Sequence, residues 1–216
     1  MIRDRHPESG KLLQSIFFLY DDIMDLNYKI IISLISVILV LIGYGPYVID
    51  IFKGKTKPHL FTFLVWGIAS SITWALQVHG GAGVGAWITF TVSAVCIIIF
   101  FLCFKYGEKN ITTLDVIFLI LALTSLFLWL VIDQPIWSVI LVVLTDILGF
   151  GPTLRKAWDK PHSETLFTWW MAAFRHGLGI AALQRFNLLT LLYPVAWTTS
   201  NIIFCIIILI RRAKIS

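Results

Sequence analysis

The chain has 216 residues, of which 58% are hydrophobic and 13% are charged, about half the charged fraction of a typical soluble domain. Apolar runs of roughly 20 residues, each long enough to cross a ~30 Å hydrocarbon core, recur along it. This composition excludes a soluble globular protein and predicts an all-α polytopic membrane protein. The net charge of +5 comes from basic residues at the ends of apolar runs, which indicates membrane orientation rather than a nucleic-acid partner.

The apolar runs predict seven membrane spans with short connections, so that neighbouring spans are antiparallel. The expected spans are residues 29–52, 60–78, 82–104, 113–132, 135–157, 164–183 and 188–210. Residues 1–28 come first, and "DDIMD" stands where a cleavable signal peptide would have small residues. We therefore expect this stretch to be an extracytoplasmic tail or an interfacial helix.

The distribution of lysine and arginine predicts the orientation of the spans. Most of the basic residues outside the spans fall on the side that carries residues 53–57, 105–109, 155–160 and 211–214. Positive charge stays in the cytoplasm. We therefore expect a multi-pass protein of the cell (inner) membrane, with the N-terminus outside and the basic tail 211–216 in the cytoplasm.

One sequence pattern occurs twice. Residues 43–63 are "GYGPYVIDIFKGKTKPHLFTF" and residues 149–168 are "GFGPTLRKAWDKPHSETLFT". Each copy has Gly-aromatic-Gly-Pro late in one helix, then a basic elbow, Pro-His and a helix that carries tryptophan. Because the copies are offset by four spans, they have the same orientation, and an axis along the membrane normal relates them.

This three-plus-one-plus-three plan resembles the SWEET sugar transporters and the wider PQ-loop superfamily over about residues 29–210. The resemblance implies two triple-helix bundles, 29–104 and 135–210, with a linker helix in 105–134. It also implies alternating access between the bundles.

Two positions of the family motif are matched in part. Pro46 and Pro152 stand where the family has prolines, and Tyr47 and Thr153 replace the glutamines that follow. A proline inside a helix removes one hydrogen bond and kinks the helix. Pro46 and Pro152 are therefore expected either to be paired hinges or to end their helices early.

Polar residues inside the spans are the candidates for a solute site. Arg175 lies close to the midplane of the sixth span, where a charge costs at least ~2.5–3.5 kcal/mol on insertion scales. Asp146, at a similar depth in the fifth span, is the best candidate for its partner. The pair is either functional or a structural ion pair. The family's transporters also place an asparagine in the third helix of each bundle, which Asn201 matches, whereas Ala94 stands at the equivalent position of the first bundle.

Tryptophans form a second set of candidates. Trp74 and Trp197 lie deep in their spans and are expected either to line a pocket or to pack between helices. Trp197 shares a helix face with Asn201, four residues on. Three tryptophans nearer the span ends are expected in the interfacial belt: Trp66, Trp87 and Trp169.

These features favour a transporter for a small polar solute, sugar-like or vitamin-like. The residues expected to contact the solute are Asn201, Trp197, Trp74, Arg175 and Asp146. No Ser/His/Asp constellation, HExxH motif or Gly-rich phosphate loop is found, so we expect no enzyme, and neither cofactor nor metal. A non-transporting receptor or interaction protein on the same scaffold is the alternative, and a membrane-embedded enzyme is less favoured. The expected partners are the solute and the bilayer, and self-association stays open.

Overall fold

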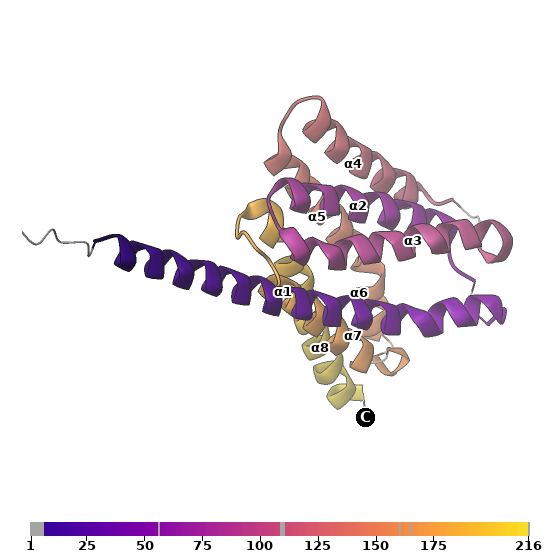
Figure 1. The fold of residues 1–216 in the computed structure, drawn as a ribbon. Coiled ribbons are helices and arrows are strands. Elements are labelled where there is room, and N and C mark those ends of the chain that lie inside the picture. Colours follow the sequence, from indigo (N-terminus) through magenta and orange to yellow (C-terminus); the bar gives the residue numbers. More distant parts are fainter. Residues whose placement is uncertain (1–6, 56, 109–110, 160, 165, 216) are drawn as a thin grey trace, which may run out of the picture.

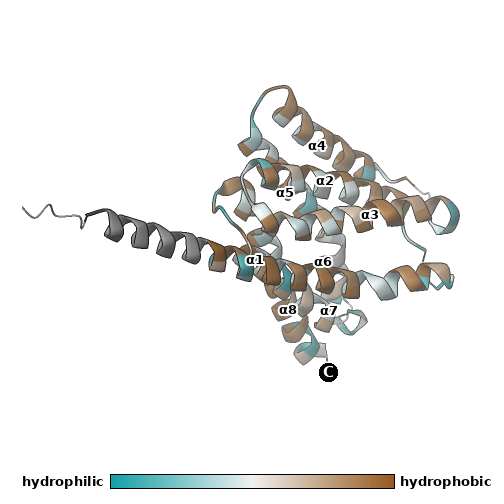
Figure 2. Ribbon diagram, in the orientation of Figure 1, coloured by the Kyte–Doolittle hydropathy of each residue, from teal (hydrophilic) through white to brown (hydrophobic). Residues whose placement is uncertain are grey.

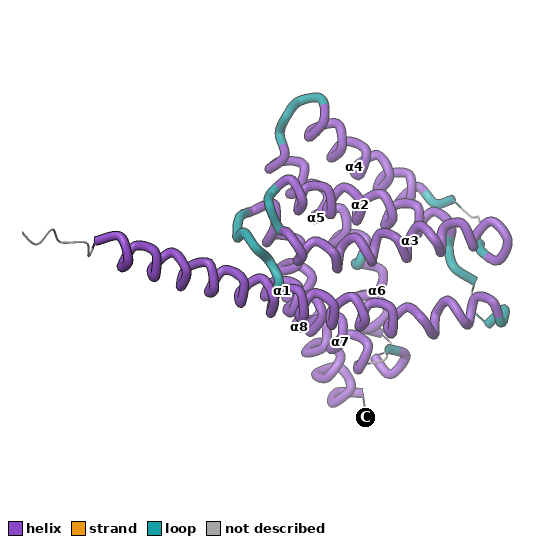
Figure 3. The backbone as a smooth tube through the Cα atoms, viewed as in Figure 1, coloured by secondary structure: helices purple, strands orange, loops and turns teal. Residues whose placement is uncertain are grey.

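A computed structural model of the protein describes residues 7–55, 57–108, 111–159, 161–164 and 166–215, with the side chains of 7–22, 152–153, 155–156, 163 and 215 excepted. The described ranges are almost entirely helical (Figure 1, Figure 3). The α-helices are α1 (Pro7–Phe52), α2 (Leu60–His79), α3 (Trp87–Tyr106), α4 (Thr113–Leu130), α5 (Pro135–Gly149), α6 (Gly151–Asp159), α7 (Leu166–Ala181) and α8 (Leu188–Ile215). Two short 3-10 helices are η1 (Gly83–Ala86) and η2 (Pro161–Ser163). The all-α fold class is confirmed.

Five helical segments are long and apolar enough to cross a membrane: Ile23–Phe52, Leu60–His79, Gly83–Tyr106, Thr113–Leu130 and Leu188–Lys214. The helices α5 and α7, of 15 and 16 residues, are shorter than these. The structure thus gives five membrane-crossing candidates, and the arrangement of seven spans stays a prediction.

The fifth expected span is not one continuous helix. It was expected over residues 135–157, but α5 ends at Gly149 and α6 begins at Gly151, with Phe150 between them. Glycine is a weak helix former, and Pro152 has no N–H to donate to the preceding turn. These residues favour a break at this point but do not by themselves require one. In the first copy of the pattern, by contrast, Pro46 lies inside the unbroken helix α1 and does not end it.

The helix α1 is longer than a bilayer requires. Its 46 residues at 1.5 Å each give ~69 Å, more than twice the ~30 Å hydrocarbon core. Figure 1 shows its first part extending beyond the other helices. Residues 7–28 therefore continue the first span as helix, and their place at the membrane interface stays a prediction.

Apolar side chains are exposed and polar side chains are buried, the opposite of the pattern in a soluble protein. Many large apolar side chains are exposed, among them Ile38 and Leu41 of α1 and Ile120 and Phe127 of α4. The coloured parts of both helices are mostly brown, the colour of hydrophobic residues, in Figure 2. The interior instead holds Gln77, Asp146, His176 and Asn201, none of them more than 6% exposed. Water-soluble proteins rarely bury charged residues and rarely expose large apolar patches. This distribution indicates a membrane protein.

Six helices form a closed ring. The contacts run from α1 to α3, from α3 to α2, from α2 to α5, from α5 to α8, from α8 to α7 and from α7 back to α1. The helix α4 stands outside the ring against α2 and α5 (Figure 1). We call α1, α2, η1 and α3 the first half, and α5 to α8 the second half. The interior of the ring is thus bounded by both halves.

At one end of the ring, which we call the hairpin end, the α2–α3 turn packs on the α7–α8 turn. The backbone N–H of Gln184 donates to the carbonyl of Ala82 at 3.1 Å. The Asn187 side-chain amide donates to the carbonyl of Gly80 at 2.7 Å. Both hydrogen bonds join the first half to the second half, and we call this contact the hairpin seam.

The seam is closely packed. Ala82, Ala86 and Leu183 are fully buried there. Gly83 has a φ of 59°, and a Cβ atom at this position would lie 2.0 Å from the Gln184 side-chain oxygen. Glycine is therefore required both by the left-handed backbone and by the approach of the other half.

A third hydrogen bond across the seam depends on Pro194, which lies inside α8. Proline has no N–H, so the carbonyl of Thr190, four residues earlier, loses its helical donor. The Gln77 amide of α2 donates to that carbonyl at 3.4 Å. The carbonyl that Pro194 leaves without a donor in the second half thus accepts a hydrogen bond from a side chain of the first half.

At the opposite end, which we call the elbow end, hydrogen bonds brace each half separately. In the first half, Leu60 N–H donates to the Glu108 carbonyl and Glu108 N–H donates to the Pro58 carbonyl, both at 2.9 Å. In the second half, Arg211 Nε donates to the Trp158 carbonyl at 2.9 Å. These bonds fix the elbows without joining the halves.

A methyl group at Gly85 tests the seam. A Cβ atom there would lie 2.9 Å from Cδ2 and 3.0 Å from Cα of Leu183, whereas one at Gly177 meets nothing within 4 Å. We expect Gly85→Ala to lower the free energy of unfolding by about 1–3 kcal/mol through overpacking. The control Gly177→Ala should leave it unchanged or raise it, because alanine favours helix. Thermal unfolding in one detergent compares them, and equal melting temperatures would contradict the close approach.

Candidate functional site

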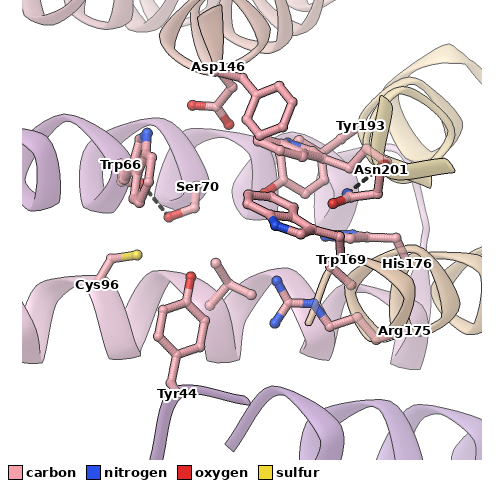
Figure 4. A pocket seen from close by; sticks show the side chains of 14 residues that line it. Tyr44, Trp66, Ser70, Cys96, Asp146, Trp169, Arg175, His176, Tyr193 and Asn201 are labelled. Atoms are coloured by element: carbon pink, nitrogen blue, oxygen red, sulfur yellow. Dashed lines mark hydrogen bonds between the residues drawn. The ribbon is translucent and has the colours of Figure 1, made fainter. Parts of the chain in front are cut away.

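A cavity of about 190 Å³ lies inside the ring. Each ring helix contributes to its wall, and so does Phe150 at the α5–α6 break (Figure 4). The wall consists of Tyr44, Trp66, Ser70, Val92, Cys96, Asp146, Phe150, Trp169, Ala172, Arg175, His176, Tyr193, Trp197 and Asn201. Its volume is below the ~300–1,000 Å³ of pockets for drug-sized ligands. The cavity therefore suits a small solute.

Helical periodicity explains which residues of α7 and α8 line the cavity. On α8, Tyr193, Trp197 and Asn201 follow at intervals of four and share one face. On α7, Arg175 and His176 lie three and four residues after Ala172, the spacing of neighbours on one side of a helix. Both helices thus turn their polar residues inward.

Arg175 and Asp146 both line the cavity but form no ion pair. The described ion pairs are Lys29–Asp25 and His59–Asp115, at 2.6 and 4.0 Å. The expected pairing fails because α8 lies between α5 and α7 in the ring, so that the two groups face the cavity from different sides (Figure 4).

The Arg175 guanidinium lies instead over an aromatic ring of the other half. Its central carbon is 5.7 Å from the centroid of the Tyr44 ring on α1. Such a cation–π contact stabilises a cation by ~0.5–2 kcal/mol, less than the several kcal/mol that burial of an ion costs. The guanidinium is therefore only partly compensated by the protein.

Aromatic rings give the cavity a rigid apolar wall. The His176 ring is stacked on Trp197, with centroids 6.1 Å apart and an interplanar angle of 17°. The Phe150 ring meets Trp169 and Trp197 edge-on, at 5.3 and 5.9 Å. Rings held by one another in this way offer flat surfaces to a planar or apolar part of a solute.

Three buried polar atoms of the wall have no hydrogen-bond partner among the residues described: Arg175 Nε, Trp197 Nε1 and Asn201 Oδ1. The Asn201 amide nitrogen, in contrast, donates to the Trp197 carbonyl at 2.6 Å. A buried polar group without a partner costs about 1–3 kcal/mol. Two donors and one acceptor thus remain for a solute or for water inside the cavity.

Four of the five expected site residues lie in the cavity wall: Asn201, Trp197, Arg175 and Asp146. Trp74 is the exception, since its ring packs on Phe90 of α3 at 5.1 Å and lies beside the buried cluster of the hairpin end. At 100° per residue, Trp74 is rotated by ~80° from Trp66, which does line the cavity. Trp74 therefore does not line this cavity, and its contact with a solute stays a prediction.

Sequence reasoning missed several residues of the wall. Trp66 and Trp169 were expected in the interfacial belt, but both line the cavity, whereas Trp87 is 54% exposed as a belt residue would be. The available signal was that Trp66 and Trp169 occupy the same position in the two copies of the pattern. Cys96 was also missed. It lines the wall from α3, the helix in which Ala94 was the expected counterpart of Asn201.

The Gly-aromatic-Gly-Pro motif contributes its aromatic residue to the cavity in both copies. Tyr44 comes from inside α1 and Phe150 from the break between α5 and α6. The motif thus serves the cavity through Tyr44 and Phe150. The side chain of Pro152 lies outside the described residues, so the hinge role of Pro46 and Pro152 stays a prediction.

No group of three or more His, Cys, Asp or Glu residues close enough to hold a metal ion occurs in the part of the chain that the structure describes. No protein-family model matches the chain, and no similar protein is found among the curated proteins or the solved structures.

A double-mutant cycle tests whether the two charges are independent. We expect the effects of Arg175→Met and Asp146→Asn on the free energy of unfolding to add within about 0.5 kcal/mol, because no ion pair couples them. Arg175→Met alone should be neutral or stabilising, since it removes a poorly compensated buried charge. Chemical unfolding of the four proteins measures the cycle. A coupling energy of about 1–3 kcal/mol would show a structural ion pair instead.

Proposed function

We propose that the protein transports a small polar solute across the membrane by alternating access between its two halves. The observation that carries this proposal is the cavity, since both halves build its wall and it holds Arg175 and Asp146, which form no ion pair with each other. Ionisable groups inside a membrane are rare and commonly mark the path of a solute or ion. A small site walled by both halves fits a solute that must pass between them.

The order of helices in the ring supports the interpretation of the two halves as repeats. If α1, α2 and α3 are equivalent to α5, α7 and α8, each contact in the ring has a counterpart. The contact α1–α3 corresponds to α5–α8, α3–α2 to α8–α7, and α2–α5 to α7–α1. The cavity wall also contains matched aromatic residues, Tyr44 with Phe150 and Trp66 with Trp169. Two halves related in this way can exchange conformations, which is the basis of alternating access in transporters built from repeats.

The two ends of the ring differ in a way that suggests which conformation this is. Hydrogen bonds join the halves at the hairpin seam, whereas those of the elbow end brace each half internally. Between the cavity and the seam lies a void of about 10 Å³ lined by Gln77, Thr89 and His176, room for about one water. We infer a state sealed at the hairpin end and entered from the elbow end, which the basic residues predict to be cytoplasmic.

A disulfide across the hairpin seam tests alternating access. The 3.1 Å hydrogen bond between Gln184 and Ala82 brings their backbones within the range that a disulfide spans. In a background without Cys96, Cys103 and Cys205, oxidation of Ala82→Cys/Gln184→Cys should stop solute uptake into liposomes, because the seam can no longer open. Reduction should restore uptake.

The matched control is a disulfide inside one half. The hydroxyls of Ser71 and Ser93 are 2.6 Å apart between α2 and α3, so Ser71→Cys/Ser93→Cys should cross-link without joining the halves and leave uptake intact. The solute is first identified by thermal stabilisation against sugars, nucleosides, vitamins and amino acids, with Arg175→Ala and Asn201→Ala as folded variants that lose the effect. Binding without uptake, or uptake that survives the locked seam, would favour a receptor or another pathway.

A further inference from the structure

We infer that the solute is a small zwitterion, whose anionic and cationic groups are held apart by an apolar or planar body. The inference rests on the proposed function only in that it places the solute in the central cavity. It adds the chemical class of the ligand, which follows from the charges of the wall and their separation.

The balance of charge in the cavity favours a zwitterion. The cavity wall contains one guanidinium, Arg175, and one carboxyl group, Asp146, on different sides of the space (Figure 4). A neutral solute such as a sugar would leave Arg175 without a charged partner, and an anionic solute would leave Asp146 to be neutralised by a proton. Burial of an unpaired ion costs several kcal/mol, whereas a solute with both charges pairs each ion at once. A zwitterion is therefore the class that the cavity best compensates.

The chemistry of each charged group favours the same class of solute. A guanidinium has a planar set of donors that matches a carboxylate or phosphate, and the Arg175 Nε donor is buried without a partner. The Asp146 carboxyl can accept hydrogen bonds from an ammonium group. The volume of about 190 Å³ leaves room only for a small molecule, which favours a carboxylate over a nucleotide phosphate.

The remaining wall of the cavity is aromatic. The stacked rings of His176 and Trp197, with Phe150 and Trp169 edge-on beside them, present apolar surface to the body of the solute. Arg175 and Asp146 lie on different sides of the cavity, with these rings beside them (Figure 4). We therefore expect separated charges with a ring or short chain between them.

A matched set of four benzene derivatives tests this inference with the full-length protein. The zwitterion is 4-(aminomethyl)benzoate, and 4-methylbenzoate, 4-methylbenzylamine and 4-methylbenzyl alcohol are its anionic, cationic and neutral relatives. Calorimetric titration, with quenching of cavity tryptophan fluorescence as a second readout, gives the four Kd values. We expect the zwitterion to bind at least about tenfold tighter than each relative, equal to about 1.4 kcal/mol. Equal or tighter binding of any relative would overturn the inference.

Variants that remove one of the two charges should change the order in which the four ligands bind. In Arg175→Gln the zwitterion should lose its advantage over the amine, and in Asp146→Asn it should lose its advantage over the benzoate. A variant that merely misfolds would lose all four ligands together and could not produce these opposite shifts. Trp74→Phe, which lies outside the cavity, should keep the wild-type order. Selectivity that does not change in either charge variant would contradict the assignment.

Uptake of the same four compounds into liposomes separates this inference from the proposed function. If the alcohol or the amine is bound best and transported, transport stands and the zwitterion class is wrong. If the zwitterion is bound with the expected shifts but is not transported, the class stands and transport is wrong.

Discussion

An arginine and an aspartate face one cavity inside a ring of apolar helices, and α8 stands between the two helices that carry them. In surroundings of low dielectric, ions without partners cost several kcal/mol each, so the fold must offset this cost elsewhere. Part of the compensation comes from the Tyr44 ring under the guanidinium. A solute or water inside the cavity must supply the remaining compensation for the two charged groups. Every ring helix accordingly turns part of its polar or aromatic face inward and leaves aliphatic side chains outside.

The two halves meet differently at the two ends, and the chemistry of the hairpin seam suggests that it can separate. Its bonds are few and neutral: two between the turns, at Ala82 and Gly80, and a long one from Gln77 to the carbonyl that Pro194 frees. Neutral hydrogen bonds contribute only ~0.5–1.5 kcal/mol each, and water can replace them. The hairpin seam can therefore hold the two halves together and can also open.

Hydropathy and the position of polar residues within apolar runs were enough to predict the helical fold and four wall residues: Arg175, Asp146, Asn201 and Trp197. These signals are local, because a polar side chain in an apolar run must face the interior wherever the helix packs. Sequence could not give the order of helices in the ring, since short loops fix antiparallel direction but not which helices touch. That order determines the inward face of α2, and therefore why Trp66 lines the cavity and Trp74 does not.

The same limit applies to the repeated motif. Its recurrence predicted related halves, and its prolines drew attention as hinges, yet the residues of the motif that line the cavity are the aromatic ones, Tyr44 and Phe150. The break at Phe150 has no equivalent in α1, although both copies carry Gly-aromatic-Gly-Pro. The motif alone therefore does not determine whether the helix continues.

The most direct measurement is the distance between spin labels on the two halves, by electron–electron double resonance in lipid nanodiscs. One pair would stand at the hairpin end, on the exposed positions Val78 and Phe186, and the other at the elbow end, on the exposed positions Lys53 and Asp159. Alternating access predicts two populations in which the hairpin distance lengthens as the elbow distance shortens, with a ligand of the cavity shifting their ratio. A single distance at both ends, unchanged by a ligand that binds, would contradict transport and leave a rigid receptor.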